Sequence, residues 1–169
     1  MFHPNLPRAA LLALPVACAL GLGACASLRP DTLPVGTPIA QARQMFFKPS
    51  DEFALRDGAK RLEFLQGKQT FMLDFDANGL LIASQQVLDA AHFAEIKPGM
   101  PEGEVLVRLG RPVQIFGVGW QKLQHVWNYR YWGGDCVWFQ VSISDATRQV
   151  TEAGVGSDPV CDAKGGRDQ

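Results

Sequence analysis

An internal repeat is the feature that most constrains how this chain can fold. The stretch 36–49 matches the stretch 99–112, with an offset of 63 residues at both ends. Phe64 falls on Trp127 at the same offset. Duplicated segments of this kind share one supersecondary plan, so the interpretation of each copy checks the other. The repeat therefore predicts two similar modules in tandem.

Each copy begins with a predicted helix. Thr37 is placed to N-cap the first helix, with a proline at the first helical position. In the second copy, Gly110 follows the last apolar residue, as a C-terminal cap residue does. Asp89 is placed to cap a short additional helix that runs to Ile96. The apolar stripes of the two principal helices are Ile39, Ala42 and Phe46 in the first copy, and Val105, Leu106 and Leu109 in the second.

Antiparallel strands follow the helices in both copies. In the first copy, segments 70–76 and 80–87 flank Ala77-Asn78-Gly79, and Asn-Gly between two such runs is a strong hairpin signal. The second copy predicts a three-stranded meander over 124–132, 136–144 and 148–153. The fold class is therefore α+β, in which short helices pack on one face of each antiparallel sheet.

The offset between the copies rises to 66 residues where 71–75 falls on 137–141, and a small insertion around Gly133-Gly134 accounts for the change. The expected organisation is a signal peptide (1–24), a lipidated tether (25–34), a first module (35–87), a second module (88–161) and a flexible tail (162–169).

The N-terminal segment is typical of a bacterial lipoprotein signal. Arg8 is its one charged residue, and 9–22 is an apolar run of signal-peptide length, too short to span a bilayer. It ends in Leu22-Gly23-Ala24-Cys25, which matches a lipobox. We therefore expect cleavage before Cys25 and acylation of its thiol. Because Ala26 rather than an acidic residue follows, we expect an outer-membrane protein that faces the periplasm.

Two cysteines other than Cys25 remain after this cleavage. In an oxidising compartment, Cys136 and Cys161 predict a disulfide between a strand and the C-terminal tail. Closing a loop of about 25 residues would stabilise the fold by roughly 3 kcal/mol. The alternatives are two unpaired thiols or, less favoured, a metal site, for which two cysteines supply too few ligands.

The second copy resembles the SmpA/OmlA (BamE-like) family of small outer-membrane lipoproteins. The matching motifs are Ile96-Lys97-Pro98-Gly99-Met100, Leu109-Gly110-Arg111-Pro112 and Trp127-Asn128-Tyr129, and the likeness covers 89–153. The first copy matches more weakly, because Phe47 stands in the place of Gly110. The tandem arrangement is also similar to the β-lactamase inhibitory protein.

This resemblance implies a non-catalytic role. SmpA/OmlA proteins support assembly of outer-membrane proteins by binding partner lipoproteins and anionic lipid, and they have no catalytic residues to carry over. The expected partners are therefore membrane lipid, through the Cys25 anchor, and envelope proteins such as the β-barrel assembly machinery. The alternative is an inhibitor or sensor that binds a periplasmic enzyme. No cofactor is implied.

One predicted strand is rich in aromatic residues that could serve the core or a partner. Trp127, Tyr129 and Tyr131 alternate along it, and Trp132 ends it. One face of this strand has to pack under the helices. The favoured interpretation is that the aromatic residues are core; the alternative is that some anchor a partner, since Tyr, Trp and Arg dominate binding hot spots. The partner-binding candidates are Tyr129, Arg130, Tyr131 and Trp132.

Other motifs favour ordinary structure over chemistry. Asp74-Phe75-Asp76-Ala77-Asn78-Gly79 resembles half of a calcium loop, but the twelfth position is Gln85 and the flanks are strands, so a hairpin turn is expected instead. His92 and His125 belong to no recognised catalytic motif, and enzyme activity is not expected. The formal net charge is −1, which does not favour nucleic acid. Acidic residues lie between the basic residues Arg56, Lys60, Arg61 and Lys68 in the sequence, so we expect a mixed, solvated surface there.

Overall fold

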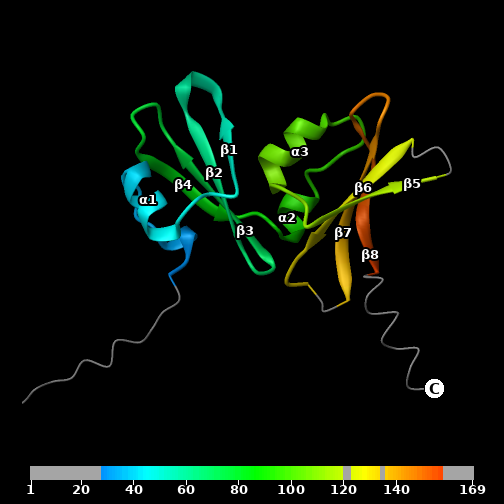
Figure 1. Cartoon of the computed structure of the whole chain (residues 1–169), viewed down its shortest axis with the longest axis horizontal. Helices are drawn as coiled ribbons and strands as arrows, with labels where there is room; N and C mark the ends of the chain where they lie inside the picture. The colour runs from blue at the N-terminus through cyan, green and yellow to red at the C-terminus, as the bar shows by residue number, and fades with distance from the viewer. Residues whose placement is uncertain (1–27, 120–122, 134–135, 158–169) are drawn as a thin grey trace, which may run out of the picture.

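Two four-stranded antiparallel sheets, separate from each other, form the framework of the protein (Figure 1). The computed structural model describes residues 28–119, 123–133 and 136–157. In chain order the elements are η1 (Pro30–Thr32), α1 (Ile39–Phe46), β1 (Asp51–Ala54), η2 (Arg56–Gly58), β2 (Lys60–Gln66), β3 (Gln69–Phe75), β4 (Leu81–Gln86), α2 (Ala90–Phe93), α3 (Glu102–Leu109), β5 (Gln114–Val118), β6 (Gln124–Arg130), β7 (Val137–Ser144) and β8 (Val150–Ser157).

The elements stack in the order α1, first sheet, α2 with α3, second sheet (Figure 1). Strands β1 to β4 make the first sheet and β5 to β8 the second, each in sequence order. One face of the first sheet and α1 enclose one core, which contains Ala42, Phe64 and Phe71. On the opposite face, Met72 of β3 joins the core formed by Val105 of α3 and the second sheet. The helices of the second module therefore have a sheet on either side.

Corresponding hydrogen bonds relate the two modules. Leu81 N–H donates to the Thr37 carbonyl, and Val150 N–H donates to the Met100 carbonyl, each at 2.9 Å. The predicted tandem repeat and the α+β class are therefore confirmed. In both modules one helix lies beside a four-stranded meander with strictly sequential neighbours.

The strand equivalences expected from the sequence are wrong by two residues. Leu81 and Val150 occupy equivalent positions, so the strands paired with them can be aligned from there. This alignment makes Phe71 equivalent to Phe139. Phe64 pairs with Phe71 and Tyr129 pairs with Phe139, so Phe64 is equivalent to Tyr129. Phe64 was instead expected to match Trp127, and segment 71–75 to match 137–141. Side chains alternate with a period of two along a strand, so a two-residue shift keeps the same face buried and the apolar pattern does not reveal it.

Two local predictions are confirmed at the atomic level. The hairpin turn over Ala77-Asn78-Gly79 joins β3 to β4, and Gly79 has a φ of 77°. Asp76 Oδ1 accepts hydrogen bonds from the backbone N–H groups of Asn78 and Leu80, both at 2.9 Å, and so holds the turn. Asp89 caps α2 by accepting from the backbone N–H groups of Ala91 and His92, at 3.0 Å each.

Other local predictions need correction. Thr37 does not cap α1, because its hydroxyl donates to the Pro34 carbonyl at 2.7 Å and Pro38 occupies the cap position. Helix α2 ends at Phe93 rather than Ile96, and β6 ends at Arg130 rather than Trp132. Strands β1, β2 and β5 were not expected. β1 and β2 carry charged residues on both faces of the sheet, and every residue of β5 is exposed. None of these three strands therefore shows a clean alternation of apolar and polar residues.

None of the helices in the described ranges is long and apolar enough to cross a membrane.

Phe47 ends α1 in a conformation that favours glycine. Its φ and ψ are 63° and −149°, close to the 79° and −164° of Gly110, which ends α3 at the equivalent position. Its side chain is 83% exposed, so core packing does not compensate for the backbone strain.

Replacing Phe47 with Gly should therefore stabilise the protein. Relief of the left-handed strain outweighs the greater freedom of glycine in the unfolded chain, so we expect a gain of about 0.5–1 kcal/mol in the free energy of unfolding. Urea denaturation measures this quantity. Phe47→Ala is the matched control, because it removes the same ring but keeps a Cβ. Equal stability of the Gly and Ala variants would contradict the strain argument.

Candidate binding surfaces and the module interface

The end of α3 is the centre of the contact between the modules. Gly110 has a φ of 79°, and its N–H donates to the Leu106 carbonyl at 2.8 Å. A Cβ built on Gly110 would lie 2.7 Å from Glu63 Oε1 and 2.9 Å from Thr70 Cγ2. Glycine is favoured here both by the left-handed backbone conformation and by the close approach of the first sheet.

Glu63 of β2 is a fully buried acid that faces the end of α3. Its Oε1 accepts the Arg111 N–H at 3.0 Å, while its Oε2 is buried and has no hydrogen-bond partner among the described residues. Burial raises the pKa of Glu63 to about 7, and the nearby Asp51 carboxylate also raises it, whereas Arg111 lowers it. The carboxyl is therefore held mainly in its neutral form at mildly acidic pH.

Tyr129 approaches the same point from the second sheet. Its hydroxyl donates to the Gly110 carbonyl at 3.0 Å, and its side chain is fully buried. Burial, together with the Glu63 charge, raises the pKa of Tyr129 well above its usual value. Gly110 thus lies between a side chain of the first sheet and one of the second.

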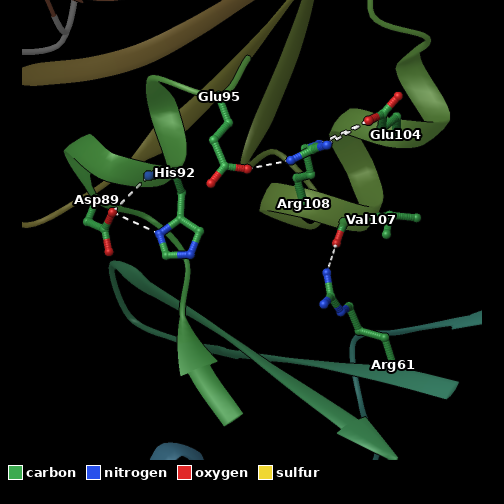
Figure 2. Close-up of polar contacts among 7 residues, drawn as sticks. All are labelled: Arg61, Asp89, His92, Glu95, Glu104, Val107 and Arg108. Carbon is green, nitrogen blue, oxygen red and sulfur yellow. Dashed lines mark hydrogen bonds and ion pairs between the residues drawn. The ribbon is translucent and has the colours of Figure 1, made fainter. Parts of the chain in front are cut away.

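Ion pairs extend this interface on both sides. Arg61 of β2 binds Asp74 through two hydrogen bonds of 2.6 and 2.7 Å, and its Nη1 donates to the Val107 carbonyl at 2.7 Å (Figure 2). Arg111 Nε lies 2.8 Å from Asp51 Oδ2. Arg61 is therefore a structural residue of the interface, and it does not belong to the solvated, mixed surface that the sequence analysis expected for it.

The α2–α3 layer is held by its own polar contacts. Arg108 pairs with Glu104 at 2.8 Å on the same helix and also contacts Glu95 (Figure 2). His92 Nδ1 lies 2.8 Å from Asp89 Oδ1. Figure 2 shows these side chains on α2, on α3 and on the residues that flank α2, above strands of the first sheet.

The second histidine also joins structural elements. His125 Nδ1 lies 2.5 Å from Asp145 Oδ1, in the turn between β7 and β8. Its Nε2 lies 3.9 Å from Glu102 Oε2 on α3. Within the described residues, the hydrogen-bond partners of His92 and His125 are carboxylates, not hydroxyl or thiol groups. No group of three potential metal ligands is found there either.

The aromatic candidates separate into core and surface. Tyr129 is fully buried, so the core interpretation holds for it. Tyr131 is half-buried and packs edge-on against Phe93, with ring centroids 4.9 Å apart. Arg130 stacks over Trp138, with Cζ 4.6 Å from the ring centroid. Trp132 is 70% exposed and is the one member of the set that is open to a partner.

The apolar surface that the sequence analysis missed lies on β5. This strand is at the edge of the second sheet, and in the described part of the chain no strand pairs with its outer side. Ile115, Phe116 and Val118 are 56%, 38% and 43% exposed, and Val113 precedes them at 48%. We call these four residues the β5 edge. The apolar run after Pro112 was the available sequence signal.

The equivalent strand of the first module is protected. In β1, Asp51 pairs with Arg111, and Glu52 pairs with Lys60 at 3.0 Å and with Arg43. Charged side chains on an edge strand discourage pairing with another chain. The β5 edge has no charged residue, although the two strands occupy equivalent positions in the repeat.

A surface cavity adjoins the β5 edge on its helix side. It has a volume of about 240 Å³ and is lined by Asp51, Leu106, Arg111, Pro112, Ile115 and Trp127. Its walls come from β1, α3, β5 and β6, so it exists only because the two modules are packed together. An apolar side chain that projects from a strand paired with β5 would have this space to enter.

Of the cysteines, Cys136 is disulfide-bonded. Cys25 and Cys161 lie outside the described residues, so the pairing of Cys136 with Cys161 stays a prediction.

No family model and no curated protein matches this chain. Among solved structures, one neighbour is a Streptococcus mutans protein described as a "putative beta-lactamase inhibitor protein", at 11% identity and a TM-score of 0.32, over 76% of this chain and 87% of that chain. Another is a cysteine-rich secretory protein of Staphylococcus aureus, at 13% identity and a TM-score of 0.26, over 75% and 45%. Both TM-scores are low, so neither likeness assigns a function or a partner.

The buried carboxyl of Glu63 makes the stability of the protein depend on pH. Its folded pKa of about 7 lies above the value of 4.5 for an unfolded chain. Between these values the unfolded chain loses the proton first, so stability falls as the pH rises. Relative to the wild type, Glu63→Gln should therefore gain about 2–3 kcal/mol of unfolding free energy between pH 5 and pH 8.

Glu52→Gln is the control for this measurement. Glu52 lies on the surface next to Lys60 and Arg43, which lower its pKa, so its replacement should not produce a gain that grows with pH. Urea denaturation at several pH values gives both curves. A difference between Glu63→Gln and the wild type that does not change with pH would show that Glu63 is ionised in the folded protein.

Proposed function

We propose that this protein is a lipid-anchored envelope protein that acts by binding another protein through the β5 edge. The lipobox supports the anchor, through acylation of Cys25 after cleavage of the signal peptide. The periplasmic face of the outer membrane is the proposed location. A disulfide between Cys136 and Cys161 fits that oxidising compartment.

The observation that carries the binding proposal is the exposure of the β5 edge. An uncharged, apolar edge strand is a template for another strand, and soluble proteins usually protect such edges. The matching strand β1 is protected by ion pairs. A partner that adds an extended segment to β5 would satisfy its outer backbone groups and cover Ile115 and Phe116. The cavity beside Ile115 would then accept a side chain of that segment.

The contacts of the polar residues fit a binding protein better than an enzyme. His92 and His125 are engaged with carboxylates that connect structural elements. Asp76 holds the β3–β4 turn and Asp74 is paired with Arg61, so the residues of the calcium-like motif act in the hairpin and the module interface.

Capture of partners with matched variants tests the proposal. We expect tagged, acylated protein from solubilised membranes to retain an envelope protein. Ile115→Lys should reduce that retention at least about tenfold, because it places a charge at the centre of an apolar contact. The control is Ile82→Lys on β4: Ile82 is 52% exposed, compared with 56% for Ile115, so the two changes are chemically matched.

The identity of the captured protein separates the two proposed roles. Subunits of the β-barrel assembly machinery would support a role like that of the SmpA/OmlA family in outer-membrane protein assembly. A soluble periplasmic hydrolase would support the inhibitor or sensor alternative. Equal retention by the Ile115→Lys and Ile82→Lys variants would exclude the β5 edge as the binding surface.

A further inference from the structure

Several segments meet at the end of the first sheet where the described chain begins. Arg29 stacks over Phe71, with Cζ 5.5 Å from the ring centroid. Phe71 is paired with Phe64 across β2 and β3, and the Phe64 ring lies 5.6 Å from that of Phe46 at the end of α1. The start of the described chain, the end of α1 and the β2–β3 hairpin therefore lie together, on the lower side in Figure 1.

This end of the molecule carries large apolar side chains that are open to solvent. Phe47 is 83% exposed, Leu28 50% and Leu65 42%. Trp132 of the second module, 70% exposed, joins them through Lys68 of the β2–β3 turn, whose Nζ lies 5.3 Å from the Trp132 ring centroid. We call this surface the tether end: Leu28, Phe47, Lys48, Leu65, Lys68 and Trp132.

The proposed anchor would hold the tether end at a membrane. Cys25 is three residues before Leu28, and three extended residues span at most about 10 Å. Acyl chains on Cys25 would therefore keep Leu28 close to the headgroups of the bilayer. The other described segments of the tether end lie next to that point.

We propose that the tether end rests on the bilayer, with Phe47 and Trp132 at the boundary between headgroups and acyl chains. Tryptophan favours this interface, and the ammonium group of Lys48 would face lipid phosphates. This inference rests on the proposed acylation of Cys25. Because Val118 pairs with Gln124 at the far end of β6 from Trp132, the β5 edge would run away from the membrane.

The strained conformation of Phe47 is a second, independent observation. The equivalent position in the second module is Gly110, which has the same backbone shape without strain. Phe47 is exposed, so folding does not explain an aromatic residue there. Strain that folding does not explain indicates a function, and contact with lipid is one that an exposed aromatic ring on a lipid-anchored protein can perform.

Quenching by brominated lipids tests the proposal on the mature, acylated protein. The vesicles contain phosphatidylethanolamine and phosphatidylglycerol, with bromine on the acyl chains. The difference in fluorescence between the wild type and Trp132→Phe isolates the Trp132 signal. We expect the brominated lipid to reduce that signal about twofold or more, as for a ring at the interface. The control is Trp132→Phe with Phe116→Trp, which moves the reporter to the β5 edge and should not be quenched.

Two further variants test the role of Phe47. Phe47→Gly should lower the quenching of Trp132 about twofold, because part of the apolar contact is lost, whereas Phe47→Leu should retain it. Equal quenching at Trp132 and at the reporter on β5, or none at either, would overturn the proposed orientation.

The mass of the same sample separates this inference from the proposed function. An acylated protein whose Trp132 is not quenched would contradict the inference alone. A protein without acyl mass on Cys25 would contradict the anchor and, with it, the tether end as a membrane contact.

Discussion

The packing of the α3 terminus against Glu63 is the contact on which the rest of the structure depends. Gly110 brings the helix end so close to β2 that a Cβ would meet Glu63 Oε1 at 2.7 Å, and Tyr129 binds the same glycine from the other sheet. The duplicated modules therefore form one body with a shared helical layer. This packing also buries the carboxyl group of Glu63, and burial raises the pKa of that group to about 7.

This packing determines which surfaces are left for partners. Because α2 and α3 have a sheet on either side, the helices of the second module are used for the core. Among the described residues, most of the large exposed apolar side chains lie elsewhere, on the β5 edge and the tether end. These surfaces differ in composition: the β5 edge has no charge, whereas the tether end combines aromatic rings with lysines. This difference fits binding of a strand of another protein at the β5 edge and contact with a lipid surface at the tether end.

The sequence predicted features that local chemistry determines. The Asn-Gly pair predicted the β3–β4 hairpin, and Asp89 predicted the cap of α2. The 63-residue offset predicted two modules in tandem. Features that depend on tertiary packing were missed. Glu63 makes β2 look polar although the second module buries it, and β5 is apolar without alternation because it lies at an edge. Among the aromatic candidates, sequence could not separate Tyr129, which faces α3, from Trp132, which lies beyond the strand.

Photocrosslinking in living cells tests the central claim, that the protein binds another protein through the β5 edge, most directly. A photoreactive residue at position 115 should form a discrete adduct with an envelope protein, whereas the same residue at position 82 should not. An adduct from position 82 with none from position 115 would contradict the account, because Ile82 and Ile115 are similarly exposed and differ mainly in the module and strand that present them.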